Sequence, residues 1–399
     1  MNKNQPELLL NNTLEDWQKK KFSLPKNTIR VGTLFSGIGA IEHALERLKL
    51  NNEIVFACDN DLAVKKSYFA NYKITEDKWH DDVSKLNAKK YKYKVDLLVG
   101  GSPCQSFSMV GKRGGLEDTR GTLFYDFARI ISECKPKVFI FENVKGLLSH
   151  DEGKTWKTIK NTFSDLGYYF SDPEVLNAKH FGIPQNRNRV FVIGFRKKKW
   201  NADFSYPRRI ELGSRMQDYL EDYVDSQFYL KEKGVKFVTS IKNQTKSYTQ
   251  VNGDIALCQK ANQQFNWHGD FIFEKVSKKL KYDESLFEIK EVESKYYLSK
   301  KVENYVLSEG TKTFITKPKT DLEIARPLLQ SMHKMHRAGV DNYVTHKGKI
   351  RKLTPRECLR LMGFRDSFKI DVSDTQAYRQ AGNSIVVDVL IALLKSIDI

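Results

Sequence analysis

Apolar and polar positions between residues 29 and 195 follow two alternating patterns. Five short runs are largely apolar and rich in β-branched and aromatic residues, whereas the longer segments between them have a helical period. Continuous apolar strands separated by helices are typical of a parallel sheet covered on both faces. We therefore predict an α/β fold with a doubly wound, mostly parallel sheet. The predicted strands are 29–35, 53–59, 95–101, 137–143 and 189–195, and the predicted helices are 40–50, 61–71, 122–134 and 154–166.

The pattern changes on both sides of this first domain, which we place at residues 29–199. Residues 1–28 are polar and weakly patterned, which predicts an N-terminal extension with a short helix and a linker. Residues 200–345 have no clear period and are rich in Lys, Asn, Gln and Tyr. We interpret them as a second, smaller domain, with one strand expected in 264–273.

A regular pattern returns in residues 346–399. Thr354 followed by Pro355 is typical of a helix start, with threonine as N-cap and proline at the first helical position, and Gly363 predicts its end. Residues 385–397 predict a buried helix. Because an apolar segment needs a surface to cover it, we expect this C-terminal part to pack back onto the first domain.

Composition narrows the class of protein. The chain has 67 Lys+Arg and 49 Asp+Glu, and the net charge of +18 indicates a polyanionic partner or simply favours solubility. The hydrophobic fraction of 40% excludes a disordered chain. No apolar run reaches the roughly 18 residues of a membrane span, and the N-terminus does not resemble a signal peptide. Five cysteines without a CxxC spacing argue against disulfides and structural zinc, so we expect a cytoplasmic protein.

Unusual residues follow four of the predicted strands. In an open parallel sheet, ligands bind outside the carboxyl ends of the strands, and these four ends share one edge. We therefore expect the functional site at that edge. In chain order the residues are Gly37 and Gly39, then Asp59, Cys104 and Glu142.

The first of these strand ends predicts a nucleoside ligand without phosphates. Gly37 and Gly39 allow the backbone to approach a ligand, but Glu42 stands where a dinucleotide site has a third glycine and would repel a pyrophosphate. Asp59 follows Gly39 by 20 residues, a spacing typical of a carboxylate that binds a ribose. S-adenosylmethionine, which has a positive sulfonium, fits this description; an ordinary βα turn is the alternative.

Cys104 and the loop after it are the next candidates. The cysteine follows Pro103 in a polar, glycine-rich context, whereas we interpret the other four cysteines as small buried hydrophobes. Lys112, Arg113 and Arg120 make the following loop basic, which is typical of a lid over an anionic ligand.

Glu142 and two arginines complete the candidate chemistry. Glu142 ends an apolar strand, where desolvation would raise its pKa. Arg187 and Arg189 open the last predicted strand, and they either pair with Glu142 or present donors to a substrate carbonyl or phosphate. His333 and His336 lack a third ligand, so we predict no metal site.

Six motifs in a fixed order resemble those of the DNA cytosine-C5 methyltransferases. The resemblance covers about 29–196 and 345–399 and is specific, because all six blocks occur in the family's order. The motifs are LFSGIG (34–39), GGSPCQSFS (100–108), FENV (141–144), QNRNR (185–189), RKLTPRECLRLMGF (351–364) and YRQAGNSIVVDV (378–389).

The resemblance implies a role for each matching residue. Phe35 would stack on the adenine of S-adenosylmethionine, Asp59 would hold its ribose, and Asp82 would meet its adenine amine. The cofactor site would comprise Phe35, Ser36, Gly37, Gly39, Asp59, Asn60, Asp82, Val83, Pro103, Asn383 and Ser384. The catalytic residues would be Cys104 as nucleophile, Glu142 at the cytosine N3, and Arg189 with Arg187 at the cytosine O2. DNA would be bound by Gln105, Lys112, Arg113 and Arg120.

Two positions depart from the family pattern. Thr33 stands where many members have an acid, and Asn60 stands where an aromatic residue often covers the adenine. Both concern contacts with the cofactor, and neither concerns Cys104 or Glu142.

The resemblance implies an S-adenosylmethionine-dependent methyltransferase fold and the methylation of a flipped-out cytosine in a specific double-stranded DNA sequence, with S-adenosylhomocysteine as product. Residues 200–345 fall where the family has its target-recognition domain. We expect a monomeric bacterial enzyme that modifies DNA. A cognate restriction endonuclease that acts separately is a candidate partner. A tRNA cytosine-C5 methyltransferase and a non-catalytic DNA-binding module are the alternatives.

Overall fold

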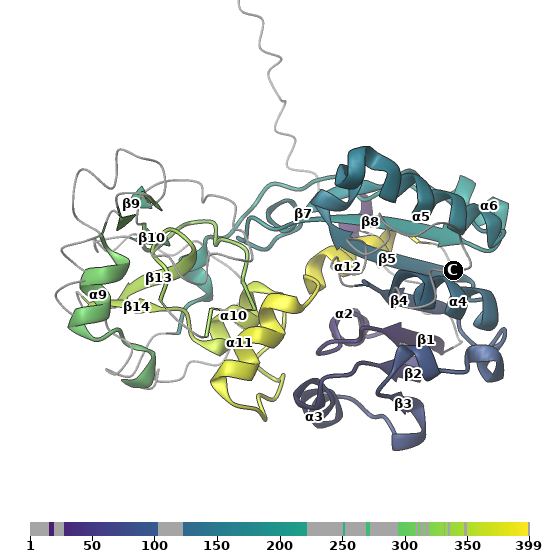
Figure 1. Cartoon of the computed structure of the whole chain (residues 1–399), viewed down its shortest axis with the longest axis horizontal. Helices are drawn as coiled ribbons and strands as arrows, with labels where there is room; N and C mark the ends of the chain where they lie inside the picture. The colour runs from purple at the N-terminus through teal and green to yellow at the C-terminus, as the bar shows by residue number, and fades with distance from the viewer. Residues whose placement is uncertain are drawn as a thin grey trace, which may run out of the picture.

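The computed structural model contains two groups of elements joined by the C-terminal helices (Figure 1). Within the part of the chain it describes, no helix is both long and apolar enough to cross a membrane. The described residues are 16–19, 28–102, 123–221, 250–251, 269–271, 294–308, 310–311, 314–315, 319–330, 332–333, 336–346 and 349–397.

The first group is built on an eight-stranded sheet with the order β3-β2-β1-β4-β5-β8-β6, in which β7 also pairs with β8. The strands β3, β2, β1, β4 and β5 are parallel. This confirms the predicted α/β class and mostly parallel sheet. The strands are β1 (Ile29–Leu34), β2 (Asn52–Cys58), β3 (Trp79–His80), β4 (Leu97–Gly100), β5 (Val138–Val144), β6 (Tyr169–Phe170), β7 (Glu174–Asn177) and β8 (Asn188–Phe195).

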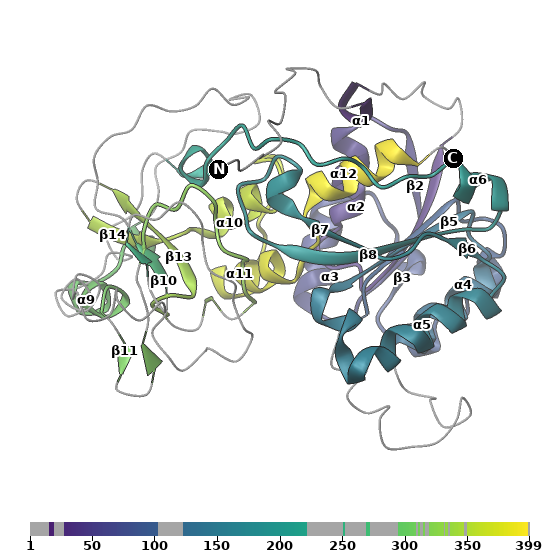
Figure 2. The same ribbon diagram turned by 90° about the horizontal axis from the view of Figure 1, so that it is seen from above.

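Helices cover both faces of this sheet, as Figure 2 shows with α2 and α12 (Val387–Ser396) on one side and α4 and α5 on the other. Successive side chains of β5 point to opposite faces of the sheet, so Val138 and Ile140 belong to one hydrophobic core and Phe139 and Phe141 to the other. The predicted helices are confirmed within a few residues. They are α2 (Ala40–Arg47), α3 (Leu62–Asn71), α4 (Leu123–Cys134) and α5 (Lys154–Asp165), and α6 (Lys198–Ala202) follows β8.

Strand β8 differs from the expectation of a parallel run. It is antiparallel to β5 on one side and to β6 and β7 on the other. The reason is a hairpin that the sequence pattern did not reveal. After α5 the chain returns in β6 and β7, which run in the direction of β5, and β8 then folds back between them and β5.

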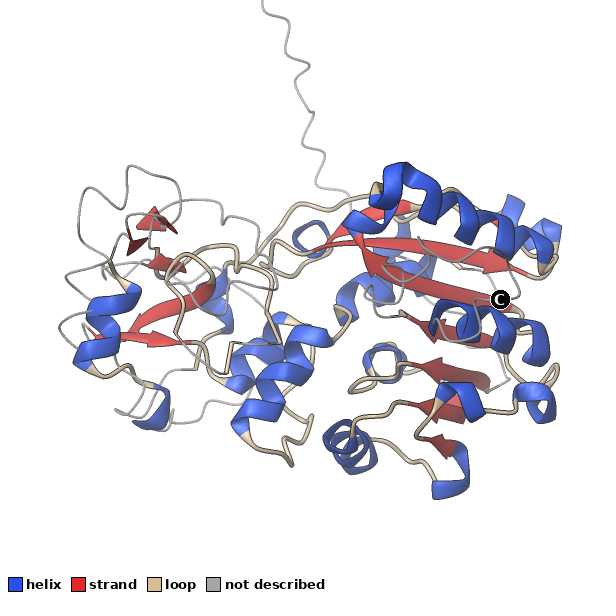
Figure 3. Cartoon of the chain, viewed as in Figure 1, coloured by secondary structure: helices blue, strands red, loops and turns tan. Residues whose placement is uncertain are grey.

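The second group contains a small sheet of order β14-β13-β10-β9, a two-stranded ribbon and the helix α9, all separate from the large sheet (Figure 3). Its strand β10 lies in the segment where a strand was expected. The elements are β9 (Gln250–Val251), β10 (Gly269–Phe271), α9 (Lys300–Val306), β11 (Gly310–Thr311), β12 (Phe314–Ile315), β13 (Asp341–His346) and β14 (Lys349–Lys352).

The chain then returns to the first group through α10 (Pro355–Leu361), α11 (Asp374–Asn383) and α12 (Val387–Ser396). Thr354 caps α10 as predicted, since its hydroxyl accepts a hydrogen bond from the Glu357 amide in a capping box. The helix ends at Leu361, two residues before Gly363. Helix α12 packs on α2, where Asp388 pairs with Arg47 at 2.6 Å.

The N-terminal helix α1 (Asp16–Lys19) lies against α12, and the Trp17 indole donates a hydrogen bond to the Arg208 carbonyl.

Candidate active site

The turn between β1 and α2 has a backbone that glycine favours. Gly37 and Gly39 have positive φ, and so does Phe35 at +53°, a conformation that costs a non-glycine residue energy and is concentrated at functional sites. Gly39 also has no room for a side chain, because a Cβ there would overlap the Tyr72 ring. Ser36 fixes the turn to β2 through two hydrogen bonds with the Cys58 backbone.

Asp59, at the end of β2, braces the same turn. Its carboxylate accepts hydrogen bonds from the amide of Gly37 at 2.9 Å and the amide of Asp61 at 3.1 Å. Burial raises the pKa of Asp59, against the effect of these two bonds. Asn60 is exposed beside it. The turn and the acid expected on a ribose are therefore held together as one unit.

Asp82 and Val83 follow β3 at the next strand end along the edge. Asp82 caps the short helix Val83–Lys85 by accepting a hydrogen bond from the Ser84 amide, and it forms an ion pair with Lys85 at 3.4 Å. Its side chain remains 43% exposed, while Val83 is buried. Asp82 thus has a free face at the same edge as Asp59.

Glu142 and Arg189 form an ion pair, with 3.0 Å between Oε1 of the glutamate and Nε of the arginine. The direction of β8 explains this contact. Because β8 is antiparallel, its amino end meets the carboxyl end of β5, and Arg189 lies opposite Val144 in the ladder. Glu142 and Arg189 are then diagonal neighbours on one face.

The end of β4 is pressed against Glu142. A Cβ built on Gly101 would lie 2.7 Å from Oε2 of Glu142 and 2.9 Å from its carbonyl oxygen, so only glycine fits here. Asn143 fixes the next residue, since its side-chain amide donates to the Ser102 carbonyl at 2.8 Å. The backbone at Gly101, three residues before Cys104, therefore passes directly beside the carboxyl group of Glu142.

Burial sets the acidity of Glu142. Desolvation raises its pKa, and this effect outweighs the opposing charges of Arg189 and Arg187. A carboxyl group whose pKa is raised can keep its proton nearer to neutral pH and donate it.

Arg187 makes different contacts from those of Arg189. It is buried, and it donates hydrogen bonds to the carbonyls of Leu328, Gly382 and Ser384 at 3.2, 2.9 and 2.9 Å. These bonds bring the end of α11, with exposed Asn383 and buried Ser384, next to the start of β8.

Gln185 is the first residue of the QNRNR motif, and the sequence alone assigns it no role. It is fully buried, accepts a hydrogen bond from the Leu328 amide and donates one to the Leu361 carbonyl. A glutamine in a fixed polar motif beside two arginines was the available signal, but only the fold identifies its partners.

Several predicted residues lie outside the described part of the chain. They are Pro103, Cys104, Gln105, Lys112, Arg113 and Arg120. Their roles stay predictions.

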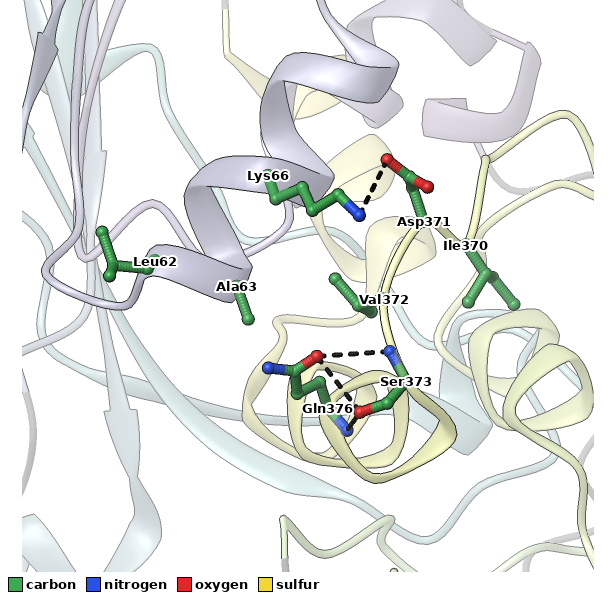
Figure 4. A pocket seen from close by; sticks show the side chains of 8 residues that line it. All are labelled: Leu62, Ala63, Lys66, Ile370, Asp371, Val372, Ser373 and Gln376. Atoms are coloured by element: carbon green, nitrogen blue, oxygen red, sulfur yellow. Dashed lines mark hydrogen bonds and ion pairs between the residues drawn. The ribbon is translucent and has the colours of Figure 1, made fainter.

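A shallow pocket of about 550 Å³ lies between α3 and the segment before α11 (Figure 4). It contains no predicted site residue. Its charged groups pair with each other, Lys66 with Asp371 at 3.4 Å, and Gln376 bonds to Ser373. This pocket therefore adds nothing to the site at the sheet edge.

Comparison with known proteins agrees with this geometry. The orphan methyltransferase M.SPRI of Bacillus phage SPR is 33% identical over 92% of this chain and 97% of its own length. The type II methyltransferase M.HpaII of Haemophilus parainfluenzae is 35% identical over 91% of this chain and 87% of its own. The crystal structure of S. pombe Dnmt2 methyltransferase has the same fold, with a TM-score of 0.59, 21% identity, and coverage of 92% and 97% of the two chains.

The profile of one protein family matches almost the whole chain. It covers residues 29–398, and its description is C-5 cytosine-specific DNA methylase. The chain therefore belongs to the C-5 cytosine-specific DNA methylases and is a DNA (cytosine-5-)-methyltransferase.

Proposed function

We propose that this enzyme methylates C5 of a cytosine flipped out of double-stranded DNA, through a covalent bond between Cys104 and C6 of the base. The pairing of Glu142 with Arg189 beside Gly101 carries the proposal. The Glu142 carboxyl group, whose pKa is raised, and the Arg189 guanidinium lie beside Gly101, which precedes Cys104 by three residues.

S-adenosylmethionine fits the turn at β1 and the two acids beside it. Asp59 holds the base of the turn through two amide hydrogen bonds, and the Asp82 side chain is 43% exposed at the same edge. Both side chains are carboxyl groups, and negative charge favours a ligand with a positive sulfonium. Phe35, Ser36, Gly37, Gly39, Asn60, Val83, Pro103, Asn383 and Ser384 complete the proposed site. When bound, the cofactor supplies the electrophilic methyl group.

The protein's own groups make C5 reactive. The Cys104 thiolate adds to C6, which breaks the aromaticity and gives C5 the character of an enamine carbon. Glu142 donates a proton or hydrogen bond to N3, and Arg189 donates to O2, so the charge that develops on the ring is stabilised. After methylation a base removes the C5 proton, the C6–sulfur bond breaks, and Cys104 leaves as thiolate.

The base must leave the stack for this chemistry, because C6 is inaccessible inside a duplex. Gln105, Lys112, Arg113 and Arg120 would hold phosphates and close over the base. We propose residues 29–199 and 346–399 as the catalytic domain and 200–345 as the recognition domain, which reads base edges in the major groove. Residues 1–28 precede both.

The names of the relatives describe two biological settings. M.HpaII is named a type II methyltransferase, whereas M.SPRI is named an orphan methyltransferase. We propose that this enzyme acts as a monomer in the bacterial cytoplasm, with any cognate restriction endonuclease acting separately.

The test is expression in cells that lack cytosine methylation, followed by bisulfite sequencing of their DNA. Conversion resistance at one recurring sequence is expected, and Cys104→Ser should abolish it. Duplex DNA with 5-fluorocytosine at that position should trap the wild type covalently, because fluorine does not leave as a proton does. Methylation of tRNA alone, or a Cys104→Ser variant of normal activity, would contradict the proposal.

A further inference from the structure

Residues 184–187, which lead into β8, form an interface with the distant segment 325–330. The Asn186 amide donates to the Ala325 carbonyl at 2.6 Å, and the Ala325 amide donates to the Pro184 carbonyl. Gln185 and Ala325 also form an isolated parallel bridge. Segment 325–330 lies within the range proposed for target recognition, so this contact joins the two functional parts of the enzyme.

Two buried side chains hold Leu328, three residues after Ala325, at both of its polar backbone groups. Gln185 Oε1 accepts from the Leu328 amide at 3.0 Å, while Arg187 donates to the Leu328 carbonyl at 3.2 Å. Both side chains also hold the C-terminal part: Gln185 donates to Leu361, and Arg187 donates to Gly382 and Ser384. Three chain segments are thus fixed at one point.

Helix α11 closes this contact from the other side. A Cβ on Gly382 would overlap the backbone of Leu329 and Gln330, so the helix and the segment touch directly. Asn383, the next residue, belongs to the proposed cofactor site. Segment 325–330 is therefore enclosed between the start of β8 and the end of α11, with no room to shift alone.

The same stretch carries the proposed catalytic arginine. Arg189 follows Arg187 by two residues and forms the ion pair with Glu142. Arg187 is buried, and its Nε has no hydrogen-bond partner among the described residues. Burying this guanidinium therefore costs hydration free energy that an apolar side chain would not cost. The geometric effect of Arg187 is to fix Leu328 and the end of α11 relative to the start of β8.

We infer that Gln185 and Arg187 are positioning residues that couple the recognition segment 325–330 to the Arg189–Glu142 pair. The inference rests on the proposed function. A recognition domain seated on its correct sequence would hold Leu328, and through Gln185 and Arg187 it would hold Arg189 in place. On an incorrect sequence the segment would be displaced and the ion pair with it. Specificity then appears in the rate of methyl transfer and not only in DNA affinity.

Gln185→Met tests the inference, because methionine keeps the volume and loses both hydrogen bonds. Single-turnover methyl transfer is measured on the duplex identified by bisulfite sequencing and on duplexes with one base pair changed. The rate on the correct duplex should fall about 10-fold, and its ratio to the rate on changed duplexes should fall by a similar factor. DNA and S-adenosylmethionine Kd values should change less than about 3-fold.

Gln380→Met is the matched control. Gln380 is also a buried glutamine, but it bonds to Ser67 and the Ala63 carbonyl of α3, so it ties together elements of the catalytic domain only. It should lose stability and leave the rate ratio unchanged. A ratio that falls equally in both variants, or that is unchanged in Gln185→Met, would overturn the inference.

Arg187→Lys is the second variant, in case Gln185→Met does not fold. It keeps the charge but lacks the planar fork that reaches three carbonyls, so the same loss of discrimination is expected. If neither variant folds, the contact is purely structural and the inference is wrong. A wild type that methylates no DNA would instead contradict the proposed function.

Discussion

Replacing Glu42 by glutamine should remove a pH dependence of stability that one carboxyl group creates. Glu42 is 1% exposed in α2, and one oxygen accepts a hydrogen bond from the Tyr68 hydroxyl at 2.6 Å. Its other oxygen, Oε2, has no hydrogen-bond partner among the described residues. Desolvation raises the pKa of Glu42 from 4.5 to about 7. The folded protein therefore binds this proton more tightly than the unfolded chain does.

The sign and size of the effect follow from that difference. A raised pKa in the folded state gives stability that is fully present below about pH 4.5 and is lost as the pH rises through about 7. One pKa unit corresponds to about 1.4 kcal/mol, so the free energy of unfolding should fall by about 3 kcal/mol over this window. Glutamine has no proton to lose and can still accept the Tyr68 hydrogen bond.

Urea unfolding of the full chain at several pH values between about 5 and 8 measures this slope. The Glu42→Gln variant should resemble the wild type near pH 5 and be more stable near pH 8. Glu46→Gln, one turn later on the same helix, is the control, because the Glu46 side chain is 52% exposed and should contribute a much smaller slope. Parallel curves for wild type and Glu42→Gln would refute the reasoning.

Four further predictions concern the site and its supports. Gly101→Ala should displace Glu142, lower kcat and destabilise the fold by about 1–3 kcal/mol, as methyl-transfer assays and urea unfolding would measure. Methyl transfer should slow as the pH rises through the raised pKa of Glu142, whereas Glu142→Gln should give a flat, low profile. Gly39→Ala, at φ +77° against the Tyr72 ring, should weaken S-adenosylmethionine binding about 10-fold or more in calorimetry. Thr354→Ala removes the cap of α10 and should cost about 1 kcal/mol in unfolding.

Sequence patterns predicted β1, β2, β4, β5 and β8 of the large sheet, because each of these strands is an apolar run with a simple local signature. The short strands β3, β6 and β7 were not predicted. Apolar side chains of β5 alternate between the cores on the two faces of the sheet. Thr354 and Glu357 are the residue types of a capping box at the start of α10. Glycines with positive φ at the β1 turn were likewise readable, since few other residues adopt that conformation. Residues close together in sequence determine each of these features, so the sequence pattern was enough to predict them.

The remaining features depend on contacts between distant residues. Nothing within Asn188–Phe195 reveals that β8 is antiparallel, because an apolar strand has the same composition in either direction. The partners of Gln185, Leu328 and Leu361, lie 143 and 176 residues away. The raised pKa of Glu42 depends on burial, and its hydrogen-bond partner Tyr68 lies 26 residues away on α3. The sequence shows that polar residues such as Gln185 and Glu42 stand in unusual places, but it does not show which residues they contact.

The reversed direction of β8 connects these observations. A parallel β8 would place its amino end, and with it Arg189, at the edge opposite Glu142, and the ion pair could not form. Because the strand is antiparallel, residues 184–189 lie at the carboxyl edge, where the ends of β4 and β5 and the C-terminus of α11 also lie. A single extended stretch can then hold Leu328 at one end and meet Glu142 at the other. The antiparallel direction of β8 therefore brings Arg189 to Glu142, while Arg187, just before the strand, binds the Leu328 carbonyl.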